Sequence, residues 1–321
     1  MIRPCQLSWP NVSKMIETRV ATDREKQAWL SDWRARLSSW YARPDGPAGW
    51  VATQVDRRIA GFNSAPESVL HALTDGDELI GLLAVSAIEQ DGQPEAVVRD
   101  IWIAPGHRRR GHGRLALAKA EQWARARQAR TVWLATDPAQ ASHAALFAAY
   151  PVRALQMIKK LSGPGVLADG LEGRPMTDAE FGDWRAEMER GYASDVADAG
   201  EMTAEQAAAS AAAQTNELLP NGLGTANNSF LCLSAGEDVV ATNWIAHHRA
   251  PGLSWVYAVE VHEGHRGRGY GRAAMVLGER ASLDAGDTHL ALNVFGHNHV
   301  AISLYTAMGY RGYDAGRSVG L

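Results

Sequence analysis

The sequence predicts an α/β fold that consists of two copies of one domain. The first observation is an internal repeat: an offset of 158 residues carries the segment 108–113, RRRGHG, onto the segment 266–271, RGRGYG. The second is that the same ungapped register aligns Leu134 with Leu292. The third is the length of 321 residues, since a domain usually holds about 100–200. A repeat of this kind decides architecture before any local signal does.

The boundary between the copies is expected near residues 162–165, SGPG, which read as a turn-rich linker. We therefore expect an N-terminal domain over residues 1–161 and a C-terminal domain over residues 171–321. Each is long enough to bury a core of its own.

The first copy opens with a helix-leaning, irregular region, residues 1–75. Four large residues recur there at helical spacing and predict a buried helix face: Trp29, Trp33, Leu37 and Trp40. Apolar runs between turn signals then predict strands over 78–88, 96–104, 131–136 and 154–161. Helices are expected between them, over 114–128 and 139–150.

The second copy shows a similar order of elements. It opens with helices over 176–191 and 203–219, the latter starting at a capping box formed by Thr203 and Gln206. Strands are expected over 229–233, 239–247, 255–261 and 289–294. Two further helices are expected over 272–284 and 300–308.

Composition excludes several classes of protein. Hydrophobic residues make up 46% and charged residues 21%, and the net charge of −4 argues against a general nucleic-acid binder. Cys5 and Cys232 cannot form a disulfide framework and lack metal-site spacing. No apolar run approaches the roughly 18 residues of a membrane span, and the N-terminus lacks the apolar core of a signal peptide. We expect a cytoplasmic protein without a metal.

Residues 172–217 carry eleven acidic residues against three arginines. One interpretation is a solvated helical surface. The other is a negative field that attracts a cationic acceptor. The sequence leaves both open.

The segment 255–272 predicts an anion site. An apolar strand is followed by a glycine-rich loop and then directly by a helix, whose first N–H groups have no partner within the helix. Gly269 and Gly271 lack Cβ, so the backbone can approach a phosphate closely. The spacing differs from the dinucleotide fingerprint and from the P-loop, which argues against a nucleotide-binding oxidoreductase.

The loop R-x-x-G-x-G resembles the pyrophosphate-binding motif of the GNAT acyltransferases, the superfamily that moves an acyl group from coenzyme A to an amine. Residues 298–310 resemble its second motif, N-x-x-A-x-x-L-Y-x-x-x-G-F/Y. The resemblance implies that each copy is a mixed, mostly antiparallel sheet flanked by helices, whose two middle strands splay apart. Acyl-CoA would lie in that opening.

The resemblance also implies a cofactor site for acetyl-CoA in the second copy. Backbone groups of Val259 and Val261 would pair with the pantetheine and hold the thioester carbonyl. The whole predicted set is Val259, Val261, Arg266, Gly267, Arg268, Gly269, Tyr270, Gly271, Arg272 and Asn298. Asn298 would bond backbone or pantetheine, a role compatible with simple capping of the following helix.

The implied catalytic residues are Tyr305 and Glu260. Tyr305 matches the general acid of the family; alternatively, it packs against the cofactor or the core. The residue aligned with the usual basic glutamate is Asn293, which cannot take a proton. Glu260 alternates with Val259 on its strand and faces the other side, so it is either the base or a salt-bridged strand residue. Four histidines are the alternative candidates for the base: His247, His248, His262 and His265.

The first copy departs from this pattern where chemistry would occur. The offset places Phe147 opposite Tyr305, Gln140 opposite Asn298 and Trp102 opposite Glu260. We therefore expect a non-catalytic half that either still binds CoA or serves only as a scaffold. Its cofactor-binding candidates are Ile103, Arg108, Arg109, Arg110, Gly111, His112, Gly113 and Arg114.

These features predict an N-acetyltransferase that transfers acetyl from acetyl-CoA to a primary amine of a small molecule, such as an antibiotic or another secondary metabolite. The length and tandem layout resemble the mycothiol synthases, so the amine of a thiol precursor is another possible acceptor. A CoA-binding regulatory or structural protein without turnover is the alternative from a different class.

Overall fold

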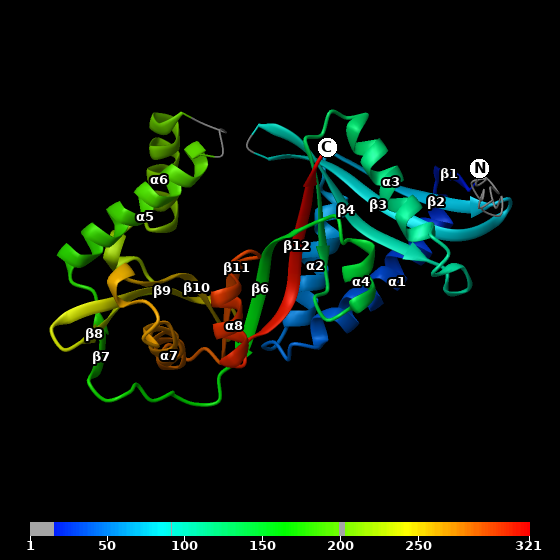
Figure 1. The fold of residues 1–321 in the computed structure, drawn as a ribbon. Coiled ribbons are helices and arrows are strands. Elements are labelled where there is room, and N and C mark those ends of the chain that lie inside the picture. The colour runs from blue at the N-terminus through cyan, green and yellow to red at the C-terminus, as the bar shows by residue number, and fades with distance from the viewer. Residues whose placement is uncertain (1–15, 91, 199–202) are drawn as a thin grey trace, which may run out of the picture. The chain divides into compact units, whose positions relative to one another are not determined.

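A computed structural model describes residues 16–90, 92–198 and 203–321, without the side chains of 192 and 194–198. Cys5 and Asp91 lie outside this part. The described residues form two compact units: one comprises those of 16–41, 52–153 and 314–321, the other those of 42–51 and 154–313. Each contains a mixed sheet flanked by helices (Figure 1), which confirms the predicted fold class.

The sheet of the first unit has the order β1-β2-β3-β4-β5-β12, and only the β4–β5 pair is parallel. Its strands are β1 (Glu17–Val20), β2 (Glu67–Asp75), β3 (Glu78–Gln90), β4 (Gln93–Ile103), β5 (Thr131–Thr136) and β12 (Arg311–Gly320). Its helices are α1 (Asp23–Ala42), α2 (Trp50–Asn63), α3 (His112–Arg125) and α4 (Ala141–Leu146).

The sheet of the second unit has the order β6-β11-β10-β9-β8-β7, and only the β10–β11 pair is parallel. Its strands are β6 (Val152–Lys160), β7 (Leu171–Pro175), β8 (Asn228–Ala235), β9 (Asp238–Ala250), β10 (Leu253–Val261) and β11 (His289–Phe295). Its helices are α5 (Asp178–Asp198), α6 (Ala204–Leu218), α7 (Tyr270–Asp284) and α8 (His299–Ala307).

The two central parallel strands of each sheet separate part-way along their length. In the second unit β10 and β11 pair only from Leu253 with His289 to Val256 with Leu292, although both strands continue. The next residue of β10, Tyr257, is the extra residue of a bulge against β9. Because a bulge bends its strand, it directs β10 away from β11.

The first unit repeats this device at the equivalent position. Pairing of β4 with β5 ends at Val98 and Leu134, and the next residue, Arg99, is the bulged one. Arg99 and Tyr257 are related by the same 158-residue offset as the glycine loops. The splay expected from the family resemblance is therefore present in both copies.

The last strand of each sheet comes from the other copy in the sequence. β6 ends the first copy in sequence but pairs with β11 at seven positions, from Ala154 with Phe295 to Lys160 with His289. Conversely, β12 ends the second copy and pairs with β5. Limits of 1–161 and 171–321 for the two repeats remain a prediction, because the compact units exchange these strands.

Other elements follow the sequence closely, with three corrections. The region 1–75 was expected to be helix-leaning, but it ends in strand β2. The helix expected over 139–150 is shorter, because α4 covers only Ala141–Leu146. The strands β1, β7 and β12 were not predicted. The capping box of α6 is confirmed, as is the buried face of α1 at Trp29, Trp33 and Leu37; Trp40 is only half-buried.

No helix among the described residues combines the length and apolar character needed to cross a membrane.

A buried ion pair anchors β6 to the second unit, and removing it tests the exchange of strands between the two copies. Lys159 Nζ lies 2.7 Å from Glu279 Oε1 of α7, and the Glu279 side chain is only 5% exposed. Lys159→Ala leaves the Glu279 carboxylate without its ion-pair partner. We expect the free energy of unfolding to fall by about 3 kcal/mol. We expect faster hydrogen exchange in residues 152–160 and 289–295.

Lys160→Ala is the matched control. Lys160 pairs with Asp45, and both side chains are more than 60% exposed. Loss of this ion pair should therefore lower the free energy of unfolding by less than about 1 kcal/mol. Equal exchange rates in the two variants would contradict the anchoring role of Lys159.

Candidate active site

The glycine loop of the second unit leaves its backbone donors unused. Gly269 caps the start of α7 in the left-handed conformation, with φ of 85°, and no side chain caps the helix. The five successive N–H groups of residues 267–271 make no hydrogen bond to any residue that the structure describes. Free amides at a helix start form a ready site for an anion.

Close packing explains why position 271 holds glycine. A Cβ atom there would lie 3.2 Å from Leu304 Cδ2 of α8 and 3.7 Å from Val261 Cγ2 of β10. The loop is also tied to the strand, because Arg266 Nε donates to the Val261 carbonyl over 3.2 Å. The guanidinium groups of Arg268 and Arg272 are exposed and pair with no described carboxylate, so their charge remains available.

The first unit preserves the same loop. Gly111 caps α3 with φ of 89°, and a Cβ on Gly113 would lie 3.3 Å from Leu146. Arg108 Nε donates to the Ile103 carbonyl over 2.9 Å, the counterpart of the Arg266 contact. Arg109 is held at φ of 60°, where its counterpart Gly267 has 79°. Since such a φ is unfavourable for arginine, its presence shows how strictly the loop shape is kept.

The other cofactor-binding candidates of the first unit lie in and beside this loop. Arg110 is exposed in the loop itself, while His112 and Arg114 occupy the first turn of α3. The amides of residues 109–114 make no hydrogen bond within the described part of the chain. The first unit thus offers the same kind of donor cradle as the second.

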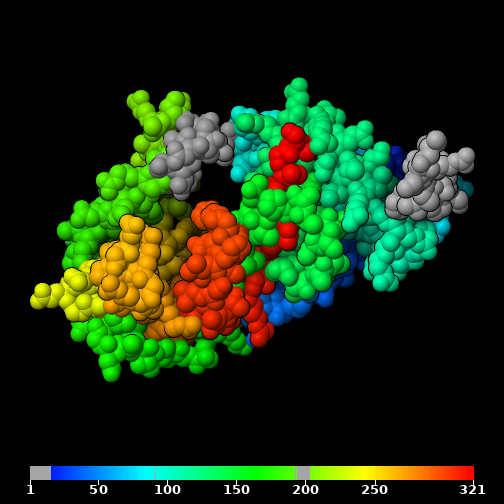
Figure 2. All heavy atoms as spheres, in the orientation of Figure 1, coloured from blue at the N-terminus to red at the C-terminus, as the bar shows by residue number. Residues whose placement is uncertain are grey.

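The open edge of β10 lies where the pantetheine was expected. The N–H group of His262 donates to Val240 of β9, and backbone groups of alternate residues point to opposite edges of a strand. The N–H and C=O groups of Val259 and Val261 therefore point to the β11 side, beyond the last β10–β11 pair, where the Val261 carbonyl accepts from Arg266. Figure 2 shows the surface hollowed between α7, in orange, and α8, in red-orange.

Helix α8 places the second motif. Asn298 Oδ1 accepts from the Ala301 N–H over 3.0 Å, so the capping role of Asn298 is confirmed. Tyr305 is 7% exposed and belongs to an apolar cluster that includes Val294 of β11 and, at its margin, Val259. Burial raises the pKa of the Tyr305 hydroxyl, which therefore stays protonated at neutral pH.

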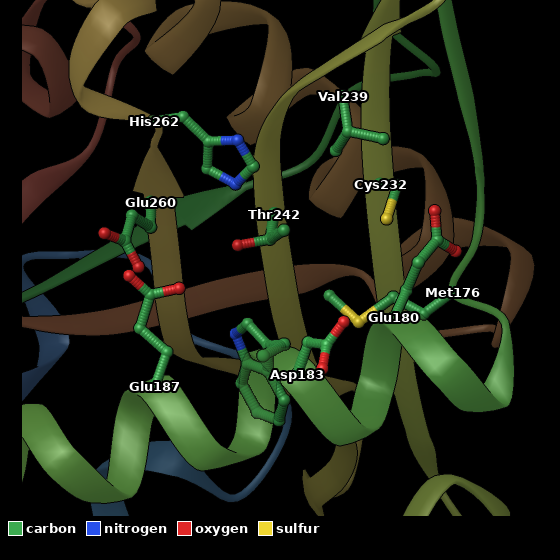
Figure 3. A pocket seen from close by; sticks show the side chains of 10 residues that line it. Met176, Glu180, Asp183, Glu187, Cys232, Val239, Thr242, Glu260 and His262 are labelled. Atoms are coloured by element: carbon green, nitrogen blue, oxygen red, sulfur yellow. The ribbon is translucent and has the colours of Figure 1, made fainter.

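Glu260 lies on the opposite face of β10, as expected. Its side chain lines a cavity of about 170 Å³, shown in Figure 3, together with residues of β8, β9 and α5. Val259 and Val261 instead pack toward α7. Glu260 forms no ion pair with a described residue, so the interpretation as a salt-bridged strand residue finds no partner here. Tyr305 does not line this cavity.

The four fallback histidines occupy different environments. His247 is buried between the hydroxyls of Ser229 and Ser254, at 2.8 and 2.9 Å, and burial lowers its pKa. His248 Nδ1 lies 3.1 Å from Asp287 Oδ1. His265 packs beside Tyr270 at the glycine loop. His262 is the one of the four that lines the Glu260 cavity.

The equivalent positions of the first unit lack these groups. Phe147 is buried in an apolar cluster and has no hydroxyl. Gln140 precedes α4 without a side-chain cap, unlike Asn298. Trp102 stands on β4 where the second unit has Glu260. The first unit therefore keeps the loop and the splay without the acid or the carboxylate.

Helix α5 contributes residues to the cavity that sequence reasoning did not assign. Asp183, Trp184 and Glu187 all line it. The spacing of Asp183 and Glu187, four residues apart in the acidic region, was the available signal. The interpretation as a field toward an acceptor is thus tied to two particular carboxylates. Asp195, Asp198 and Glu201 of the same region lie outside the described side chains.

Comparisons with known proteins agree with this geometry. The acetyltransferase (GNAT) family model matches residues 22–149 and again 196–310. A mycothiol acetyltransferase of Streptomyces scabiei is 27% identical over 95% of this chain and 94% of its own length. The uncharacterized N-acetyltransferase YycN of Bacillus subtilis is 30% identical over 44% of this chain and 92% of its own length.

Among solved structures, a GCN5-related N-acetyltransferase from Sphaerobacter thermophilus covers 95% of each chain with a TM-score of 0.53 at 18% identity, a likeness of fold. The family model matches both copies, and relatives span nearly the whole chain. The chain therefore belongs to the GNAT acetyltransferase family, as a tandem member, and is an acyltransferase.

Proposed function

We propose that the protein transfers an acetyl group from acetyl-CoA to the primary amine of a small molecule, and that the second unit does this chemistry. The observation that carries the proposal is the row of free amides at residues 267–271, which stands beside the open edge of β10. The amides would hold the diphosphate of the donor. The edge at Val259 and Val261 would hold its pantetheine and direct the thioester toward the splay.

The reaction is direct acyl transfer. The neutral amine nitrogen attacks the thioester carbonyl carbon, the C–N bond forms, and the C–S bond breaks. Glu260 accepts the proton that the amine loses, directly or through water, and Tyr305 donates a proton to the departing thiolate. The products are an acetamide and the free thiol of coenzyme A. Acetyl is proposed because the family generally uses acetyl-CoA.

We assign no chemistry to the first unit. Its loop, Arg108 to Arg114 with Ile103, keeps the free amides and is proposed to hold a second coenzyme A without turnover. Phe147 cannot donate a proton to a thiolate. A scaffold role without CoA is the alternative.

The full-length similarity to mycothiol acetyltransferases favours a second candidate acceptor. It is the amine of a thiol precursor of the mycothiol type. A panel of amines that includes such a precursor, followed by release of the CoA thiol, tests both acceptors. Acetyl-CoA that binds without turnover of any amine would favour the regulatory alternative.

Gly271→Val tests the loop. The new side chain would press on Leu304 and Val261 and displace the start of α7. We expect the affinity of the second unit for acetyl-CoA, measured by calorimetry, to fall at least about tenfold, the value of one charge-assisted hydrogen bond. Gly264→Ala is the control, since a Cβ there meets nothing within 4 Å.

Gly113→Val should abolish only the second binding event, which the first unit would provide. Unchanged affinity of the second unit in Gly271→Val would refute its loop as the diphosphate site. One binding event in the unmodified protein, unaffected by Gly113→Val, would make the first unit a scaffold.

Tyr305→Phe removes the proposed acid and little volume. We expect kcat to fall by about 10²-fold or more, while the Kd for acetyl-CoA changes less than about threefold. Tyr310→Phe is the matched control, because its ring lies 5.9 Å from the Tyr305 ring in the same cluster. An unchanged kcat in Tyr305→Phe would exclude it as the acid.

Glu260→Gln and His262→Gln test which of two groups is the general base: Glu260 on β10, or His262 directly after it. We expect Glu260→Gln to lower kcat by about 10²-fold with acetyl-CoA affinity unchanged, and His262→Gln to change it little. Part of the lost rate should return at high pH, where hydroxide or water can take the proton. The opposite ranking would move the base to His262.

A further inference from the structure

The cavity beside Glu260 carries more negative charge than the reaction needs. Three carboxylates line it without a cationic partner in the described chain: Glu260 of β10 and Asp183 and Glu187 of α5. Proton acceptance accounts for one of them. Asp183 and Glu187 stand one helical turn apart on the same face, an arrangement that is unfavourable for like charges in isolation.

Two neighbouring acids of the same helix are neutralised. Glu180, also at the cavity, forms an ion pair with Arg174 at 2.6 Å, and Glu189 pairs with Arg185 at 2.7 Å. Among the α5 carboxylates that line the cavity, Asp183 and Glu187 are therefore the ones without a described ion-pair partner. Figure 3 shows the carboxyl groups of Glu187 and Glu260 turned toward one another.

A hydroxyl group in the cavity wall also has no hydrogen-bond partner among the described residues. Thr242 of β9 is only 8% exposed, lines the cavity, and its hydroxyl makes no hydrogen bond to a described residue. Figure 3 shows this hydroxyl pointing into the cavity. A buried hydroxyl normally has a partner, and this one can accept from an N–H donor.

The remaining wall suits a cation as well. Trp184 also lines the cavity, and its ring makes an edge contact with Trp244, with ring centroids 5.8 Å apart. An indole ring attracts an ammonium group. The volume of about 170 Å³ lies below the roughly 300–1,000 Å³ of drug-sized sites, which favours a short, thin molecule.

We propose that the acceptor is a short aliphatic diamine: one nitrogen reacts beside Glu260, while the second is held as an ammonium by Asp183 and Glu187. This inference rests on the proposed function, since it names the acceptor of the same site. The second charge would orient the molecule so that the neutral nitrogen faces the thioester. Acetylation of the first nitrogen would leave the second one charged.

The test compares molecules that differ only in the second charge. Full-length protein and acetyl-CoA are assayed for thiol release with diamines from 1,3-diaminopropane to 1,6-diaminohexane, and with the amino alcohols of equal length. We expect kcat/KM for the best diamine to exceed that of its amino alcohol at least about tenfold. Glu187→Gln should reduce the diamine value about tenfold and leave the amino alcohol within about twofold.

Glu217→Gln, an exposed glutamate of α6 that does not line the cavity, is the matched control and should behave as the unmodified protein. Equal kcat/KM for diamines and amino alcohols, or equal effects of Glu187→Gln on both, would overturn the inference while the acetyl transfer itself stands.

Calorimetry of diamine binding to the CoA-loaded protein separates the remaining cases. Diamine binding that weakens about tenfold in Glu187→Gln, without turnover of any amine, would support the diamine site and refute the proposed reaction. Diamine binding no tighter than that of the amino alcohol would overturn the inference whether or not turnover occurs.

Discussion

The separation of β10 from β11 after Val256 is the constraint on which the second unit depends. Two parallel strands in the middle of a sheet normally satisfy each other's backbone groups along their whole length. The bulge at Tyr257 turns β10 away, so the backbone edge at Val259 and Val261 has no partner strand. The same strand ends at the glycine loop, where further N–H groups are free. The unpaired edge of β10 and the free amides of the glycine loop therefore lie next to one another along the chain.

The two copies show which parts of this design are geometric and which are chemical. The first unit retains the bulge at Arg99, the left-handed Gly111 and the contact of Arg108 with the Ile103 carbonyl. It even holds Arg109 in a conformation that suits glycine. Phe147 and Trp102 replace the two groups that could move protons. The loop shape is therefore separable from the groups proposed for proton transfer, and only the second unit has both.

Much of this could be predicted from sequence because the signals are local. A glycine loop between a strand and a helix determines its own backbone, so the starts of α3 and α7 were predicted within two residues. The cap at Asn298 and the capping box at Thr203 follow from neighbouring residues for the same reason.

The features that escaped prediction depend on distant contacts. The pairing of β6 with β11 and of β12 with β5 links residues that are far apart in sequence, and no local pattern specifies such partners. The cavity could not be predicted for the same reason. Asp183 and Glu187 line it together with Glu260 and Thr242 only because α5 packs against the sheet. The roles of Glu260 and Tyr305 remain predictions for a related reason: geometry positions them, while proton transfer must be measured.

A crystal structure of the full-length protein grown with coenzyme A tests the central claim most directly. The expected result is a diphosphate within hydrogen-bonding distance of the amides of residues 267–271, with the pantetheine along Val259 and Val261 and its sulfur in the splay. A diphosphate bound elsewhere, with that loop free of ligand, would contradict it.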